Sequence, residues 1–121
     1  MKSYSRLNSP QVAEIMIKGR AVHTSSFLMK YIEGEKGLPS GFSFISPKKG
    51  FKTAVLRNKA RRRGRAAFQA VIKRLDIKET QHNKSFLVVF LLKPLVLNSQ
   101  HFSLQEDIQQ SLSKSGIMQT L

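Results

Sequence analysis

Residues 53–75, TAVLRNKARRRGRAAFQAVIKRL, carry a long helical repeat of apolar and small side chains. At about 100° per residue, these side chains gather on one stripe, made of Ala60, Gly64, Ala67, Phe68, Val71 and Leu75. Polar and basic side chains gather on a neighbouring arc, made of Asn58, Arg61, Arg62, Arg65 and Gln69. The pattern predicts a helix from about Thr53 to Leu75 with one core-facing side and a separate basic side. Gly64 lies inside the apolar stripe, which indicates either close approach of another backbone or simple tolerance of glycine.

The same helix lies in a strongly basic part of the chain. Residues 36–75 contain no carboxylate and twelve of the 21 Lys and Arg, and Arg57 to Arg65 holds six cations together with Asn58. Arg57, Arg61 and Arg65 stand four residues apart, where like charges repel one another on a helix. Such an array favours binding to nucleic acid, because each neutralised phosphate releases counterions. Asparagine adds both a hydrogen-bond donor and an acceptor. We therefore predict that this helix binds nucleic acid.

Length and composition bound the remaining possibilities. With 121 residues, 40% of them hydrophobic, we expect one folded domain over residues 1–121 despite the net charge of +14. The absence of cysteine excludes a disulfide scaffold and cysteine catalysis, and fits a reducing cytoplasm. The longest apolar run, Phe86 to Leu92, is too short to span a bilayer, and Met1 to Tyr4 is not followed by an apolar signal segment. We expect a cytoplasmic protein without a membrane partner.

The residues before the long helix predict one helix and two or three strands. The first helix is expected to begin at Ser9, as the capping residue, and to end at Gly19. Residues 21–33 are typical of an extended segment, residues 34–40 of a hairpin connection, and residues 41–46, GFSFIS, of a further strand.

The residues after the long helix predict one strand and a closing helix. Residues 84–92, KSFLVVFLL, are apolar on both sides, as in a central strand covered on both faces. Ser103 to Glu106 forms a capping box that predicts the start of the last helix, and Gly116 is placed to end it. The fold class is therefore α+β, and we expect a small two-layer sandwich of three helices on a mixed four-stranded sheet.

Protein-based catalysis has little support in the sequence. The seven carboxylates show no spacing typical of a paired acid and base, His23, His82 and His101 are isolated, and no serine lies in a nucleophile elbow. Residues 46–50 lack the Gly-Lys-Ser ending of a phosphate-binding loop. We expect no catalytic residue, no metal site and no organic cofactor in the protein. Four aromatic residues fit either stacking on unpaired bases or, more often at strand spacing, the core: Phe27, Tyr31, Phe42 and Phe44.

Residues 52–68, KTAVLRNKARRRGRAAF, resemble the signature of the bacterial ribonuclease P protein subunit. That signature reads Ala-Val-x-Arg-Asn-Arg-x-Lys/Arg-Arg-x-x-Arg-x-x-Phe, and it matches without a gap. Residues 12–19 are similar to the family's first helix, residues 43–49 to its strand and Ser-Lys-Lys turn, and residues 103–117 to its closing helix. The likeness spans nearly the whole chain, and residues 52–68 are its specific part.

The resemblance implies a subunit of the endonuclease that makes mature tRNA 5′ ends, with ribonuclease P RNA and precursor tRNA as partners and no obligate protein partner. The family's RNA performs the hydrolysis with Mg²⁺, which the RNA mainly holds. The protein holds the 5′ leader in a cleft between the long helix and the sheet. The positions that match the family's RNA contacts are Arg57, Asn58, Lys59, Arg61, Arg62 and Arg65. The candidate residues for the leader cleft are Val12, Met16, Lys30 and Tyr31.

The resemblance also implies a left-handed crossover, in which the long helix joins the GFSFIS strand to the KSFLVVFLL strand. This is the reverse of the hand found in about 98% of such units. The sequence departs from the family pattern in four respects: Lys59 replaces an arginine, Arg63 and Gly64 replace apolar residues, Val12 and Met16 replace aromatic residues, and two extra residues lie between Ser46 and Ala54.

Two other classes of protein remain open from the residues alone. One is a ribosomal or RNA-chaperone protein of similar basic α+β build with no associated enzyme. The other is a DNA-binding protein that reads the major groove with residues 57–65, although no dimerisation segment is evident.

Overall fold

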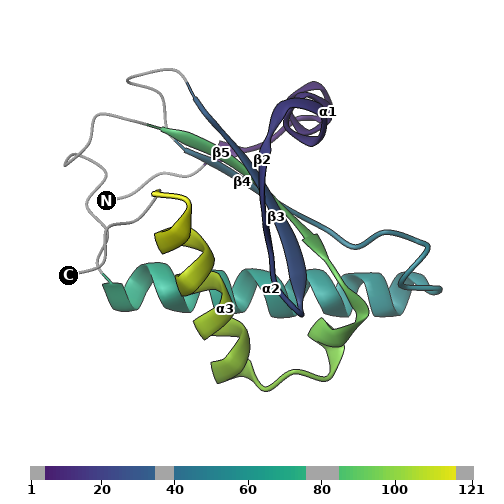
Figure 1. Cartoon of the computed structure of the whole chain (residues 1–121). Coiled ribbons are helices and arrows are strands. Elements are labelled where there is room, and N and C mark those ends of the chain that lie inside the picture. The colour runs from purple at the N-terminus through teal and green to yellow at the C-terminus, as the bar shows by residue number, and fades with distance from the viewer. Residues whose placement is uncertain (1–4, 35–39, 76–84, 117–121) are drawn as a thin grey trace.

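The computed structural model describes residues 5–34, 40–75 and 85–116 (Figure 1). The helices and the mixed sheet form an α+β fold, in agreement with the predicted class. In chain order the elements are β1 (Ser5–Arg6), α1 (Ser9–Lys18), β2 (Arg20–His23), β3 (Phe27–Glu33), β4 (Gly41–Ile45), α2 (Ala54–Leu75), β5 (Phe86–Leu92), the 3₁₀ helix η2 (Pro94–Leu97) and α3 (His101–Lys114).

The strands form one mixed sheet in the order β1-β4-β5-β3-β2. β5 lies between β4, to which it is parallel, and β3, to which it is antiparallel, with Phe90 opposite both Phe44 and Met29. This confirms that KSFLVVFLL supplies a central strand. β2 to β5 make up the predicted four-stranded sheet, and β1 adds a two-residue edge strand parallel to β4. α2 connects the parallel neighbours β4 and β5, as the crossover prediction requires; its left hand stays a prediction.

The extended segment predicted over residues 21–33 is divided into two antiparallel strands, β2 and β3. The chain reverses at Thr24, whose hydroxyl oxygen accepts hydrogen bonds from the backbone N–H groups of Ser26 and Phe27. Such local bonds from threonine offer the backbone an alternative to the sheet ladder. The predicted hairpin connection over residues 34–40 is also wrong, because β5 lies between β3 and β4; residues 35–39 lie outside the described residues.

The predicted N-caps of α1 and α3 are corrected by one and three residues, to Asn8 and Gln100. α1 is capped by Asn8, not Ser9, because Asn8 and Gln11 exchange side-chain hydrogen bonds with each other's backbone N–H groups at 2.9 Å. α3 begins at His101, so Ser103 lies within its first turn and the predicted capping box is wrong.

The predicted helix ends are confirmed at both glycines. α1 ends immediately before Gly19, where a Cβ atom would stand 2.4 Å from the carbonyl oxygen of Ile15. α3 ends two residues before Gly116, which has a positive φ of 79° suited to glycine.

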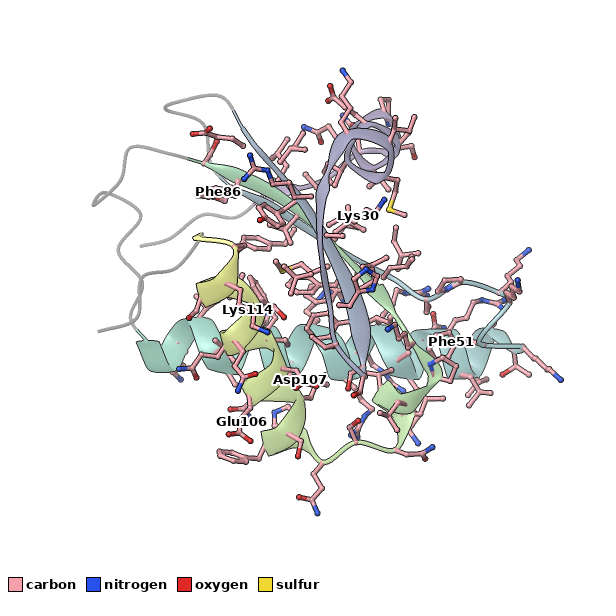
Figure 2. The ribbon with its side chains drawn as sticks, viewed as in Figure 1. Lys30, Phe51, Phe86, Glu106, Asp107 and Lys114 are labelled. Carbon is pink, nitrogen blue, oxygen red and sulfur yellow. The ribbon has the colours of Figure 1, made fainter. Side chains whose placement is uncertain are left out.

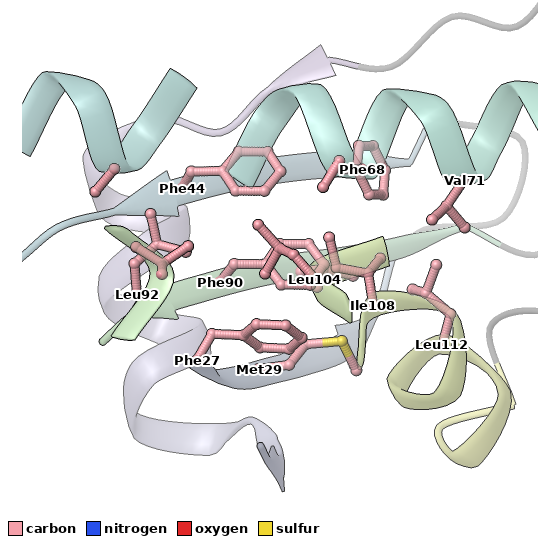
Figure 3. Close-up of a cluster of buried hydrophobic side chains, with 14 of the residues drawn as sticks. Phe27, Met29, Phe44, Phe68, Val71, Phe90, Leu92, Leu104, Ile108 and Leu112 are labelled. Atoms are coloured by element: carbon pink, nitrogen blue, oxygen red, sulfur yellow. The ribbon is translucent and has the colours of Figure 1, made fainter. Parts of the chain in front are cut away.

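The main core lies between the sheet and the two helices α2 and α3, while α1 covers part of the opposite sheet face (Figure 1). Phe90 is fully buried at its centre, with its ring centroid 5.3 Å from that of Phe27, 5.0 Å from Phe44 and 5.8 Å from Phe68 (Figure 3). The predicted apolar stripe of α2 is buried here at Ala60, Gly64, Ala67, Phe68 and Val71. None of the described helices is long and apolar enough to cross a membrane.

The aromatic residues of the strands belong to this core. Phe27 and Phe44 are buried, and Tyr31 and Phe42 are half-buried against the same cluster, so the core interpretation holds for all four. Gly64 also serves packing: a Cβ atom there would lie 3.2 Å from Phe44 and 3.3 Å from Leu92. The close neighbours are side chains from the sheet and not another backbone.

Candidate RNA interface

Burial of the apolar stripe of α2 turns its basic arc outward. Asn58, Lys59, Arg62 and Arg65 are exposed, whereas Arg57 and Arg61 are half-buried. Among the described residues the salt bridge found is between Lys18 and Glu14, on α1. The described carboxylates therefore form no salt bridge with these α2 cations. The positive charge of the α2 side chains stays available to an anionic partner.

The loop before α2 fixes the start of this helix. Phe51 is fully buried, and its backbone N–H closes a turn onto the carbonyl oxygen of Pro47 at 3.1 Å. Arg57 donates from Nη1 to the carbonyl oxygen of Phe51 at 3.0 Å, while the hydroxyl oxygen of Thr53 accepts from the N–H of Leu56 at 3.2 Å. The loop that carries the two extra residues is thus anchored to the core and to Arg57.

The guanidinium of Arg61 is held by two hydrogen bonds within the protein. Its Nη1 donates to the Ser46 hydroxyl at 3.0 Å, and its Nη2 donates to Oδ1 of Asn58. The Ser46 hydroxyl in turn donates to the carbonyl oxygen of Arg57 at 3.0 Å. The structure therefore brings Arg57, Asn58 and Arg61, all predicted from the sequence, into one hydrogen-bonded group centred on Ser46.

The other predicted cations differ in how firmly they are held. The guanidinium of Arg65 lies 5.8 Å from the centroid of the Phe44 ring, within cation–π distance. Lys59 and Arg62 make no ion pair within the described part of the chain. The interface thus combines positioned arginines with cations on exposed side chains.

Arg63 explains one departure from the family pattern. Its Nε donates to the carbonyl oxygen of Val96 at 2.8 Å, and its Nη2 donates to the carbonyl oxygen of Ser99. Arg63 therefore ties α2 to η2 and to the segment between η2 and α3, away from the basic arc. On a helical wheel Arg63 falls on the far side of the apolar stripe from Arg61, so the sequence shows its separation from the basic arc but not its two partners.

The structure brings three of the four candidate leader residues together. Val12 and Met16, on α1, pack against the smaller core cluster on the outer sheet face. Lys30, on β3, reaches α1 on that face and donates from Nζ to the carbonyl oxygen of Met16 at 2.7 Å (Figure 2). Tyr31 packs against the main core instead, because successive residues of a strand point to opposite faces. Its grouping with the other three is wrong.

The expected place of the leader cleft is also corrected. Side chains from both sides fill the space between α2 and the sheet, among them Phe44, Phe68 and Phe90 (Figure 3). A single-stranded RNA has no room in this packed layer. The described sheet face that carries α1 is covered less completely, since Leu28 and Leu91, which pair across β3 and β5, are only half-buried.

Comparison with known proteins identifies the family. The family model Ribonuclease P matches residues 1–116. The ribonuclease P protein of Staphylococcus aureus shares the fold at a TM-score of 0.59, with 21% identity over 91% of this chain and 94% of that chain. The Thermotoga maritima protein does so at a TM-score of 0.61, with 17% identity over 91% of this chain and 96% of that one. No curated protein matches the chain in sequence.

The family match covers the basic helix, the sheet and the closing helix together. It decides against the two other classes, the ribosomal or RNA-chaperone protein and the DNA-binding protein. The chain belongs to the ribonuclease P protein family and is a protein subunit of bacterial ribonuclease P, a tRNA-processing ribonucleoprotein whose RNA is its partner.

Proposed function

We propose that the basic arc of α2 is the surface with which this subunit binds ribonuclease P RNA. The observation that carries the proposal is the hydrogen-bonded group of Arg57, Asn58 and Arg61, which lies beside exposed cations and without a described carboxylate in salt-bridge range. Arginine forks bind phosphate in a bidentate manner, whereas Lys59 supplies a point charge. The RNA interface is made of the arc residues Asn58, Arg61, Arg62 and Arg65 together with Arg57 and Lys59, which flank the arc on either side.

We assign the hydrolysis to the RNA subunit and not to this chain. Within the described residues, no three His, Asp or Glu side chains lie close enough together to hold a metal ion. We propose that the RNA mainly holds the Mg²⁺ ion, as the resemblance to the family implies. The protein would contribute by shielding RNA phosphates that otherwise repel each other. Its place of action would be the cytoplasm.

We place the 5′ leader of precursor tRNA on the sheet face that carries α1. Val12, Met16 and Lys30 lie together there, and Lys30 uses one of its three N–H donors on Met16, which leaves two for a leader phosphate. The half-buried Leu28 and Leu91 lie on the same sheet face and offer apolar contact to bases or riboses. Tyr31 has no part in this site, because it faces the main core.

Binding of the RNA should depend steeply on salt. If the five cations of the interface reach phosphates, the logarithm of the binding constant should fall with the logarithm of salt concentration at a slope of about −3.5 to −4.5. The measurement is a filter-binding or fluorescence titration of bacterial ribonuclease P RNA at several KCl concentrations. Arg65→Ala should reduce the slope by about one unit.

Lys114→Ala is the matched control for this titration. It removes an exposed cation on α3, outside the basic arc, and should leave the slope unchanged. An affinity that does not change with salt would show that the α2 cations are solvated and not bound to phosphate.

A further inference from the structure

We propose that Ser46 is a positioning residue that holds Arg61 in its RNA-binding conformation before the RNA arrives. This inference rests on the proposed role of α2 and adds a residue that lies outside that helix. Ser46 follows directly after the end of β4 and is only 5% exposed, so its position is fixed by the packing around it.

The Ser46 hydroxyl is used both as donor and as acceptor. It donates to the carbonyl oxygen of Arg57 at 3.0 Å and accepts from Nη1 of Arg61 at 3.0 Å. A serine hydroxyl carries one proton and two lone pairs, so these two bonds are compatible with each other. Alanine at this position would leave the Arg61 guanidinium without its contact to the end of β4.

Asn58 provides the second point at which Arg61 is held. Its Oδ1 accepts from Nη2, so the two partners occupy two of the five N–H donors of the guanidinium. Three donors remain for a phosphate, in a side chain whose rotamers are already restricted. Immobilising a long side chain during binding costs free energy and weakens the complex. Because Arg61 is already immobilised in the folded protein, RNA binding does not bear this cost.

Ser46→Ala should weaken binding of ribonuclease P RNA about three- to tenfold, the usual effect of having to immobilise one long side chain. The salt slope should stay that of the unchanged protein, because Arg61 still carries its charge and still reaches phosphate. Ser111→Ala is the matched control: Ser111 is equally buried and donates to the carbonyl oxygen of Asp107 within α3. It should leave RNA affinity unchanged, and thermal melting of both variants checks folding.

A double-mutant cycle with Arg61→Ala separates positioning from a general structural effect. Arg61→Ala alone should lower both the affinity and the salt slope, and adding Ser46→Ala to it should have no further effect on affinity. Full affinity in Ser46→Ala, or an equal loss with and without Arg61, would overturn the positioning role while leaving the α2 interface in place. If Arg61→Ala changes neither affinity nor slope, the proposed interface itself fails at this residue, and the positioning role fails with it.

Discussion

Replacing Arg61, Arg62 and Arg65 with alanine should weaken binding of ribonuclease P RNA about a thousandfold at physiological salt. The three side chains lie on the outward arc of α2, and each charge-assisted hydrogen bond to phosphate contributes roughly a tenfold factor or more. The fold should survive, because the described core uses the opposite stripe of the helix. The measurement is a binding titration combined with thermal melting.

The matched control removes three cations elsewhere. Lys18, Arg20 and Lys114 are exposed on α1, β2 and α3, so their replacement with alanine changes the net charge by the same amount. RNA affinity should then fall far less than in the α2 triple variant. An equal loss in the two triple variants would mean that overall charge, and not the α2 surface, determines binding.

Phe90→Ala should lower the free energy of unfolding by about 3–5 kcal/mol, the usual cost of removing a buried phenylalanine ring. Phe90 has no solvent exposure and contacts the rings of Phe27, Phe44 and Phe68. The cavity would lie between the sheet and α2, so the basic helix would also lose its support. Urea denaturation followed by circular dichroism measures the change.

Phe102→Ala serves as the control for this substitution. Phe102 lies on α3 with 63% of its surface exposed, and its removal should change stability by no more than about 0.5 kcal/mol. Equal denaturation midpoints for the two variants would show that the Phe90 cluster does not carry the stability of the fold.

The elements with strong periodicity could be predicted from the sequence. α2 was predictable because its apolar stripe repeats over about four turns. The stripe coincides with side chains that the structure buries, among them Ala60, Ala67, Phe68 and Val71. β5 was predictable because a short run that is apolar on both sides fits a strand with neighbours and cover on both faces. In both elements the local pattern and the tertiary packing agree.

The remaining features depend on contacts between distant residues. No periodicity in the sequence shows that Arg63 binds carbonyl oxygens more than thirty residues away, or that Ser46 meets Arg61. The turn at Thr24 was missed because one polar triplet inside an extended pattern is a weak signal. Tyr31 could have been placed, since Lys30 and Tyr31 are adjacent in a strand and must face opposite ways.

Cleavage of precursor tRNA by a bacterial ribonuclease P RNA at low Mg²⁺ tests the central claim most directly. With this protein present, cleavage at the mature 5′ end should occur at Mg²⁺ concentrations at which the RNA alone is inactive. The variant lacking Arg61, Arg62 and Arg65 should not restore it, and the protein without RNA should not cleave. Cleavage by the RNA-free protein, or no stimulation of the RNA by a folded protein, would contradict the account.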